Sequence, residues 1–207
     1  ISGFGADERV FSKLDFGKND VHFIPWKIPE KHESITSYAE RMQKDIVHVN
    51  PVLVGLSFGG MMSIEIAKLI PAEKVILLSS ISTFHELPLF MKISGKLHLN
   101  RLIPMKPYSI LEPLENYNLG VKTTEQKKLT REYRKKLNLQ YSNWAIDQVV
   151  TWKNEIIPTK LVHIHGTKDH IFPIKYIKNP DYIIRGGGHL LSMNNAEEVS
   201  NILKLIV

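Results

Sequence analysis

The sequence contains no cysteine. Disulfide bonds, thiolate metal sites and cysteine nucleophiles are therefore all excluded. It also lacks an apolar run long enough to span a membrane, and it lacks a charged stretch leading into an apolar secretion signal. We therefore expect a cytoplasmic protein with no transmembrane segment. The chain begins at Ile1 without an initiating methionine, so the sequence leaves open what precedes it.

The excess of positive charge is concentrated in one segment. The net charge is +6 over 207 residues, and residues 122–136 alone carry seven basic side chains against Glu125 and Glu132. A basic helix over 124–137 could meet an anionic substrate, an acidic partner or a membrane surface, or it could simply be a solvated helix face. No aromatic platform interleaves these charges, so we expect no nucleic-acid partner.

The most informative stretch is residues 51–62, PVLVGLSFGGMM. An apolar run leads directly into a G-x-S-x-G motif at Gly55, Ser57 and Gly59, and the residues that follow can continue as a helix to Ile70. This pattern predicts a strand, a sharp turn and a helix. A serine at the apex of such a turn has a strained backbone that flanking glycines accommodate, and its hydroxyl stands clear at the edge of a sheet. Ser57 is therefore our candidate nucleophile.

Strand patterns and helical patterns alternate along most of the chain. Short β-type runs are expected at residues 1–5, 21–24, 52–54, 74–78, 161–165 and 182–184. Helices are expected between several of them, with Asp7 and Ser34 as N-caps of the first two. This alternation predicts an α/β fold, with a mostly parallel sheet and helices on both of its faces. The chemistry of such sheets gathers beyond the carboxyl ends of the strands.

The alternation stops between residues 84 and 142. This segment contains four prolines, scattered apolar residues and then the basic stretch. Thr123 followed by Gln126 predicts a capping box, and Leu129, Tyr133 and Leu137 form one apolar stripe on the helix that follows. We interpret residues 84–142 as a helical insertion between two parts of a core, residues 1–83 and 143–207.

Two further polar side chains follow strand patterns near the end of the chain. Asp169 comes just after the run 161–165, and His189 comes just after 182–184. A serine hydroxyl needs a base within hydrogen-bond reach, and that base must be held by a third group. We therefore predict that Ser57, His189 and Asp169 meet, with the Ser57 hydroxyl within about 3 Å of a His189 ring nitrogen.

Together these motifs resemble the α/β-hydrolase family over nearly the whole chain. The matching segments are the nucleophile elbow GLSFG at 55–59, the acid loop HGTKD at 165–169 and the histidine loop GGGH at 186–189. The resemblance implies the α/β-hydrolase fold with a helical cap at residues 84–142. Because the family's N-terminal strands are absent, it implies a reduced sheet of about six strands.

The resemblance also implies an oxyanion hole. Residues 2–5, SGFG, resemble the loop in which this family usually carries His-Gly-X, with Ser2 in place of the histidine. By position, the first donor to the oxyanion would be the backbone N–H of Phe4. The second would be the backbone N–H of Phe58, which follows the nucleophile.

Each of these residues also has a purely structural interpretation. Ser57 could be a small residue in a tight turn between a strand and a helix. Asp169 and His189 could cap the helices that follow them. Gly3 and Gly5 could belong to an ordinary turn.

A histidine-rich stretch that overlaps the acid loop is similar to a metal-binding motif. His163, His165, Asp169 and His170 approach an H-x-H-x-D-H pattern, but three residues separate His165 from Asp169 where that motif has one. His163 and His165 also share a strand whose neighbouring residues are typical of a core. We therefore expect no bound metal and no other cofactor.

A serine with these partners predicts a hydrolase that cleaves a carboxylic ester or thioester through an acyl-enzyme. Serine at the elbow argues against the dehalogenase and epoxide hydrolase branches of the family, whose nucleophile is a carboxylate. The expected partner is a small acyl substrate, and the apolar residues between 87 and 102 favour a greasy acyl or small aromatic group. Two alternatives remain: a non-catalytic or very slow ligand-binding receptor on the same fold, and an acyltransferase or C–C bond hydrolase with the same three residues.

Overall fold

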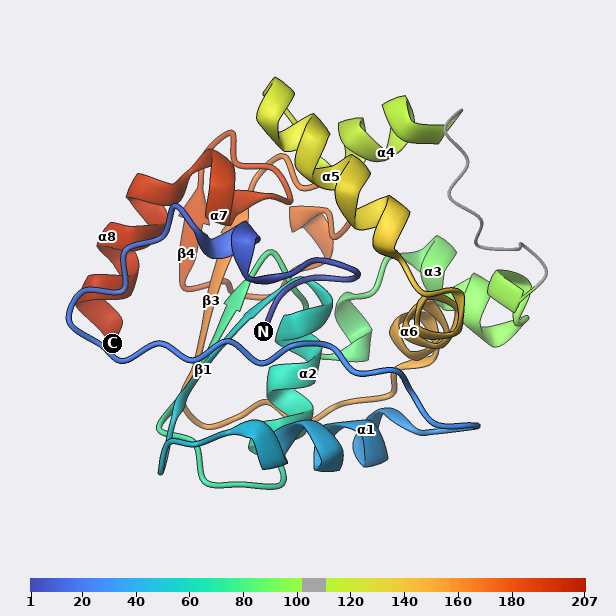
Figure 1. The fold of residues 1–207 in the computed structure, drawn as a ribbon, viewed down its shortest axis with the longest axis horizontal. Coiled ribbons are helices and arrows are strands. Elements are labelled where there is room, and N and C mark those ends of the chain that lie inside the picture. The colour runs from blue at the N-terminus through green and yellow to red at the C-terminus, as the bar shows by residue number, and fades with distance from the viewer. Residues whose placement is uncertain (102–110) are drawn as a thin grey trace.

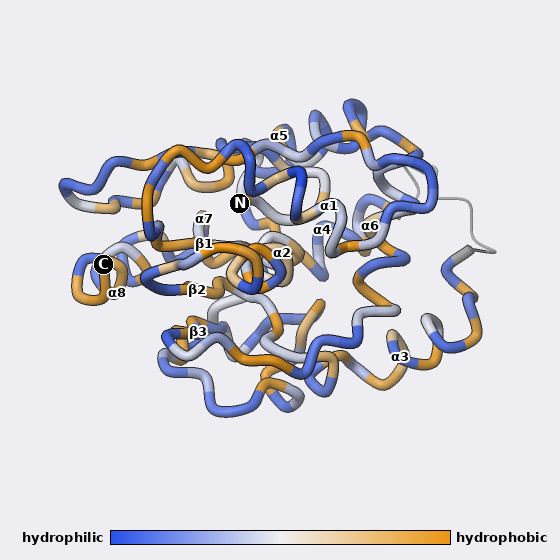
Figure 2. The backbone as a smooth tube through the Cα atoms, turned by 90° about the horizontal axis from the view of Figure 1, so that it is seen from below, coloured by the Kyte–Doolittle hydropathy of each residue, from blue (hydrophilic) through white to orange (hydrophobic). Residues whose placement is uncertain are grey.

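The computed structural model describes residues 1–101 and 111–207, and the part of the predicted cap at 102–110 lies outside this range. Four parallel strands form one sheet in the order β1-β2-β3-β4. Their bounds are β1 (Val52–Leu56), β2 (Lys74–Leu78), β3 (Leu161–Gly166) and β4 (Tyr182–Ile184). Figure 2 shows the first three stacked in this order. The prediction of an α/β fold with a parallel sheet is confirmed.

Helices connect and flank the strands (Figure 1). Their bounds are α1 (Ile35–Met42), α2 (Phe58–Ala67), α3 (Leu89–Lys96), α4 (Glu112–Leu119), α5 (Thr124–Lys136), α6 (Leu139–Thr151), α7 (Leu191–Asn194) and α8 (Ala196–Ile206). A short 3-10 helix, η1 (Glu8–Phe11), precedes them. None of the described helices is both long and apolar enough to cross a bilayer.

The sheet separates two apolar cores. Side chains of successive strand residues point to opposite faces of the sheet. The side chains of β2 are buried on both faces. Val75 and Leu77 pack into the core that contains residues of α1, α2 and α6, whereas Ile76 and Leu78 pack into the core that contains residues of α8. Burying each of these side chains stabilises the fold by about 1.5–3 kcal/mol. Packing on both faces therefore fixes the position of the central strands, from whose ends the following loops begin.

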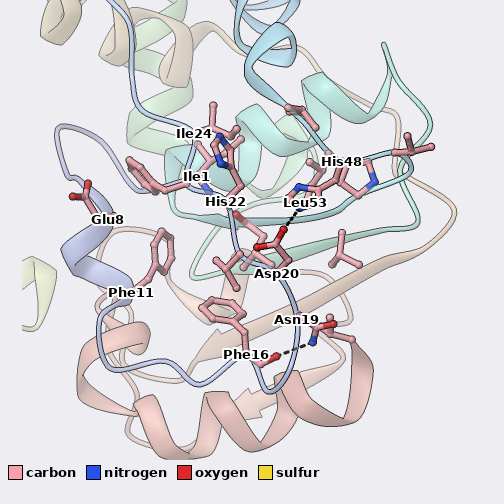
Figure 3. A pocket seen from close by; sticks show the side chains of 18 of the residues that line it. Ile1, Glu8, Phe11, Phe16, Asn19, Asp20, His22, Ile24, His48 and Leu53 are labelled. Carbon is pink, nitrogen blue, oxygen red and sulfur yellow. Dashed lines mark hydrogen bonds and ion pairs between the residues drawn. The ribbon is translucent and has the colours of Figure 1, made fainter.

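The expected number of about six strands was wrong: the described residues form four. Of residues 1–5, only Ile1 reaches the sheet, where its nitrogen donates to Val54 O over 2.7 Å and its oxygen accepts from Leu56 N over 3.0 Å. The chain then turns away, with Ala6 N donating to Gly3 O. Residues 21–24 pair with no described strand, because a cavity separates them from β1 (Figure 3).

Three helices begin at the predicted caps. The Ser34 side chain caps α1, and Thr123 and Gln126 form the complete capping box of α5. Asp7 also caps the helix that follows it, which is the short 3-10 helix η1. α6 begins at Leu139, so the proposed boundary between cap and core at residues 142 and 143 falls inside a helix.

The basic helix α5 is partly neutralised by α4. Arg131 lies 2.7 Å from a Glu112 carboxylate oxygen, and Arg134 lies 3.1 Å from one of Glu115. Figure 1 shows the two helices side by side at the top of the molecule, above α7. Solvent and salt weaken ion pairs that lie on the surface, as these do. Part of the local positive charge therefore joins α5 to α4.

Candidate active site

Ser57 occupies the turn between β1 and α2. Its backbone angles are φ 54° and ψ −122°, a strained left-handed conformation for a residue with a side chain. Its N–H donates to Leu78 O over 2.9 Å, and its carbonyl accepts from Gly60 N over 2.9 Å and from Ser80 Oγ over 2.7 Å. With donor and acceptor both engaged, the backbone of Ser57 is held rigidly in this unusual geometry.

The glycines of the elbow permit close backbone approaches. A Cβ atom on Gly55 would collide with the backbone of Gly59 one turn along the chain. A Cβ atom on Gly59 would collide with the carbonyl groups of Ile1 and Ser2. The motif therefore brings the N-terminal loop directly against the start of α2, beside Ser57.

The three predicted polar side chains meet. His189 Nε2 lies 2.8 Å from Ser57 Oγ, as the sequence led us to expect, and His189 Nδ1 lies 2.8 Å from Asp169 Oδ2. The exposed fractions of Ser57, His189 and Asp169 are 9%, 4% and 3%. Because a carboxylate only accepts, Nδ1 carries the proton and Nε2 presents a lone pair to the serine hydroxyl. This is the protonation pattern that a general base requires.

Asp169 is fixed on both of its oxygens. Oδ1 accepts from the backbone N–H groups of Ile171 over 2.8 Å and Phe172 over 2.9 Å, while Oδ2 accepts from His189. Burial acts to raise the pKa of Asp169, but the neighbouring His189 and these hydrogen bonds outweigh it, and the pKa is lowered. The carboxylate is therefore ionised at neutral pH and can stabilise positive charge on the imidazole.

Two buried histidines stand behind Asp169. His165 Nε2 lies 2.8 Å from Phe172 O and 3.7 Å from Asp169 Oδ2, and His163 Nε2 lies 3.1 Å from His165 Nδ1. Burial lowers the pKa of His163 to about 3 and also lowers that of His165, so both are neutral. In the neutral pair, His163 donates to His165, which donates to Phe172 O. The sequence predicts a core-like strand for these two residues, but spacing along the chain gives no signal of their hydrogen bonds behind Asp169.

No metal-binding constellation accompanies them. Among residues 1–101 and 111–207, no group of three or more acidic or histidine side chains is arranged to hold an ion. The rings of His163 and His165 are engaged with each other and with Phe172 O, as described above. His170 instead places its ring 4.6 Å from that of Tyr117 on α4.

The N-terminal loop and the start of α2 each supply one free backbone donor next to Ser57. A Cβ on Gly3 would lie 3.4 Å from Ser57 Cβ, so the loop passes directly over the serine. The N–H of Phe4 and the N–H of Phe58, in the first turn of α2, donate to no other described residue. The start of α2 also carries the positive end of the helix dipole. These are the properties of an oxyanion site.

Ser2, which stands where the resembling loops carry histidine, has a structural role. It is fully buried, and its Oγ donates to Ala6 O over 2.7 Å and accepts from Trp26 Nε1 over 3.1 Å. The same indole N–H also lies 3.1 Å from Gly3 O. The Ser2 hydroxyl thus fixes the turn of the loop.

Aromatic rings surround the free donors. Phe4 stacks on Tyr141 with ring centroids 5.8 Å apart, and Phe58 stacks on Trp26 at 5.0 Å and meets Trp144 edge-on at 6.0 Å. Tyr141 and Trp144 belong to α6. The immediate surroundings of Ser57 are therefore apolar and aromatic on this side.

Residues 119–126, within the predicted insertion, contact the segment that follows His189. Asn194 Nδ2 donates to Gly120 O over 2.8 Å, and Gln126 Nε2 donates to Asn194 Oδ1 over 2.8 Å. Nearby, Leu190 N donates to Leu119 O over 3.2 Å. Sequence reasoning identified Gln126 only as half of a capping box. Its second contact joins α5 to the segment that carries His189.

Solved structures show where this architecture occurs. No family model matches the sequence, and no curated protein matches it in sequence. A thermophilic esterase from Thermogutta terrifontis is similar with a TM-score of 0.70 at 14% identity, over 99% of this chain and 86% of the esterase. A lipase-esterase related protein from Clostridium acetobutylicum is similar with a TM-score of 0.64 at 16% identity, over 100% of this chain and 92% of that protein.

A structure described as a bromoperoxidase is similar to the same degree. This protein, from Bacillus anthracis, matches with a TM-score of 0.64 at 17% identity, over 99% of this chain and 88% of its own. At such identities the likeness shows a shared fold and not a shared reaction. The function must therefore be argued from the geometry at Ser57.

Proposed function

We propose that this chain, which has the α/β-hydrolase fold, is a serine hydrolase that cleaves a carboxylic ester or thioester through an acyl-enzyme. The observation that supports this is the continuous hydrogen-bonded series from Ser57 Oγ through His189 to Asp169, with 2.8 Å at each step. A hydroxyl linked to a base, with the base oriented by a buried carboxylate, is the arrangement that activates serine as a nucleophile.

In this proposal His189 Nε2 takes the proton from Ser57 as Oγ attacks the substrate carbonyl carbon. The backbone N–H groups of Phe4 and Phe58 bind the oxyanion, where loss of one donor typically costs about 3 to 4 kcal/mol of transition-state stabilisation. His189 then passes the proton to the leaving alkoxide or thiolate, and an acyl-enzyme remains. Water, deprotonated by His189, attacks the acyl carbon, and the acid is released as Ser57 regains its proton.

Asp169 keeps the imidazole in one tautomer during both halves of the reaction. Its lowered pKa keeps the carboxylate ionised, so it stabilises the imidazolium that forms when His189 accepts a proton. His165 acts behind it as a positioning residue, because it holds the carbonyl of Phe172, whose N–H binds Asp169.

Residues 84–142 would serve as a cap that selects the acyl group. Ser57 is only 9% exposed, so a substrate must enter past the neighbouring elements. The aromatic rings of Phe4, Phe58 and Tyr141 favour an apolar or aromatic acyl chain over a charged one. The substrate class we propose is accordingly a small, apolar acyl ester or thioester.

Stopped-flow hydrolysis of p-nitrophenyl esters of increasing chain length tests the proposal. We expect a burst of p-nitrophenol equal to about one per chain, followed by slower turnover, because the acyl-enzyme accumulates. Ser57→Ala should abolish both phases, whereas Ser37→Ala, which removes an exposed hydroxyl, should leave both unchanged. Binding of the ester without release of p-nitrophenol would contradict the hydrolase and favour the receptor.

A further inference from the structure

Each candidate oxyanion donor shares a peptide unit with the carbonyl group of the residue before it. The N–H of Phe4 belongs to the same unit as Gly3 O, and the N–H of Phe58 belongs to the same unit as Ser57 O. A peptide unit is planar, and its N–H and C=O point in opposite directions when the bond is trans, as it is throughout the described chain. Whatever holds the carbonyl therefore also sets the direction of the N–H.

Side chains from two other parts of the chain hold these carbonyls. Ser80 Oγ donates to Ser57 O over 2.7 Å. Trp26 Nε1 donates to Gly3 O over 3.1 Å. Both bonds reach the side of the peptide unit opposite the free N–H, so they orient the donor without occupying it. A hydrogen bond to the carbonyl also polarises the unit and strengthens its N–H as a donor.

Ser80 has a fixed position just beyond β2. It is fully buried, and a Cβ atom on Gly60 would collide with its side chain. The residue between β2 and Ser80 is Ser79, whose φ of 47° turns the chain sharply. Leu78 O accepts from Ser57 N over 2.9 Å on one side of this turn, and Ser80 Oγ donates to Ser57 O on the other. The end of β2 therefore holds both backbone groups of the nucleophile.

Trp26 contacts both halves of the candidate oxyanion site. Its indole N–H is shared between Gly3 O and Ser2 Oγ, at 3.1 Å from each. Its ring stacks on that of Phe58, with centroids 5.0 Å apart and 11° between the ring planes. One side chain therefore contacts the loop that carries the first donor and the residue that carries the second.

Backbone hydrogen bonds keep both turns formed independently of these side chains. Ser57 O also accepts from Gly60 N over 2.9 Å. Gly3 O also accepts from Ala6 N over 3.2 Å. Removal of one side-chain donor should therefore change the direction and strength of the N–H on the other side of the peptide unit, and should not unfold the turn.

We propose that Ser80 and Trp26 are positioning residues for the oxyanion site, because they aim its two N–H groups by holding the carbonyls of the same peptide units. This inference rests on the proposed function, since it needs an oxyanion to form. As Ser57 Oγ bonds to the substrate carbon and His189 takes the proton, the electron pair of the carbonyl bond moves to its oxygen. Donors that already point at this oxygen stabilise the charge without reorganisation.

A pair of substrates separates a positioning role from a structural one. The first is the p-nitrophenyl ester that the parent hydrolyses fastest, and the second is its thionoester, in which sulfur replaces the carbonyl oxygen. Sulfur is a weak hydrogen-bond acceptor, so cleavage of the thionoester gains little from the two donors. The readouts are kcat, KM and the ratio of kcat/KM for the ester to kcat/KM for the thionoester.

Ser80→Ala removes the hydroxyl, and Trp26→Phe removes the indole N–H but keeps a ring against Phe58. Each should lower kcat for the ester by about 10- to 100-fold, less than loss of a donor itself would, and change KM little. The ester-to-thionoester ratio should fall by about the same factor. Ser80→Cys, which keeps a weaker donor of similar size, should restore part of the ratio.

Ser63→Ala and Trp152→Phe are the matched controls. Ser63 is fully buried and its Oγ donates to Gly59 O over 2.8 Å. Trp152 is buried and its indole N–H donates to a Glu65 carboxylate oxygen over 2.8 Å. These variants remove the same two kinds of donor from other buried positions. They should leave kcat and the ratio unchanged, even where they lower the free energy of unfolding as much.

An unchanged ratio in both Ser80→Ala and Trp26→Phe would overturn the proposal, whatever their stability. An equal fall of the ratio in the two controls would overturn it as well. If Ser80→Ala does not fold, Ser80→Cys and Trp26→Phe give the same comparison. A parent that hydrolyses no ester would instead contradict the proposed function and, with it, this inference. The two proposals therefore fail on different measurements, namely the activity of the parent and the ratio among active variants.

Discussion

His189 Nε2 lies 2.8 Å from Ser57 Oγ although 132 residues separate them, and they follow the two strands at opposite ends of the sheet. The contact is possible because the histidine loop extends back toward the carboxyl ends of the central strands. Lys168 N donates to Gly187 O, and Thr167 Oγ1 accepts from Gly186 N, so two hydrogen bonds join the acid loop to the histidine loop. The alignment of serine and imidazole therefore depends on this pair of loops.

Asp169→Asn should lower kcat for an ester substrate by about 10⁴, with little change in the folded structure. An asparagine NH2 group can donate a hydrogen bond to His189 Nδ1, where the carboxylate of Asp169 can only accept one. The variant therefore favours the His189 tautomer with its proton on Nε2, which cannot accept the proton of Ser57. Steady-state kinetics with the p-nitrophenyl ester that the parent hydrolyses fastest provides the measurement. Asp20→Asn, at an exposed position, is the control. A loss smaller than about tenfold would mean that the acid does not orient the base.

Gly59→Ala should destabilise the protein by about 1–3 kcal/mol or prevent folding, because the added Cβ would meet the carbonyls of Ile1 and Ser2. Gly188→Ala is the matched control, since its Cβ would meet its nearest neighbours at 3.7 Å and 3.8 Å, which is ordinary contact. Urea unfolding followed by circular dichroism measures both. Equal stabilities of the two variants would show that the N-terminal loop does not pack against α2 as described.

The buried histidines should make the protein acid-sensitive. Because the pKa of His163 falls from 6.5 to about 3 on folding, the unfolded chain binds more protons than the folded one between these values. The free energy of unfolding should therefore decrease as the pH falls below 6.5, by about 1.4 kcal/mol per pH unit for this residue.

His163→Phe tests this pH dependence. The slope of unfolding free energy against pH should become shallower by about one proton between pH 6 and 4, whereas His98→Gln, at an exposed position, should leave it unchanged. An unaltered slope in the first variant would mean that His163 is not buried in a neutral form. The comparison uses slopes, so a general loss of stability in the variant does not obscure it.

Asn194→Ala should loosen the contact between residues 119–126 and the segment that follows His189. The variant removes the hydrogen bonds to Gly120 O and from Gln126, and typical losses are about 1–3 kcal/mol where a partner is left unsatisfied. Amides of residues 119–126 should exchange faster, and kcat should fall more than KM changes, because His189 is less well positioned. Asn201→Ala, on the exposed side of α8, should alter neither. Unchanged amide exchange at residues 119–126 in Asn194→Ala would show that the Asn194 hydrogen bonds do not stabilise this segment.

Local sequence patterns predicted the elements that position the site. Strands at 74–78 and 182–184 were expected with the bounds that the structure has, and the caps at Ser34 and Thr123 were placed correctly. These features depend on neighbouring residues, namely an apolar run or a hydroxyl before a helix. The elbow at Ser57 was predicted for the same reason.

Features that depend on distant pairing were not predicted. The predicted number of strands was wrong. The β-type composition of residues 21–24 does not say whether another strand lies beside them, and in the structure a cavity lies beside them instead. The roles of His163 and Asn194 likewise depend on residues of other elements, such as His165 and Gln126. Spacing along the chain carries no signal for such contacts.

The most direct test of the central claim is labelling with a fluorophosphonate probe, which reacts with activated serines. The purified protein should be labelled stoichiometrically at Ser57, and both Ser57→Ala and a denatured sample of the parent should remain unlabelled. Labelling of Ser57→Ala to the same extent, or no labelling of the folded parent, would contradict the account of Ser57 as a nucleophile activated by His189 and Asp169.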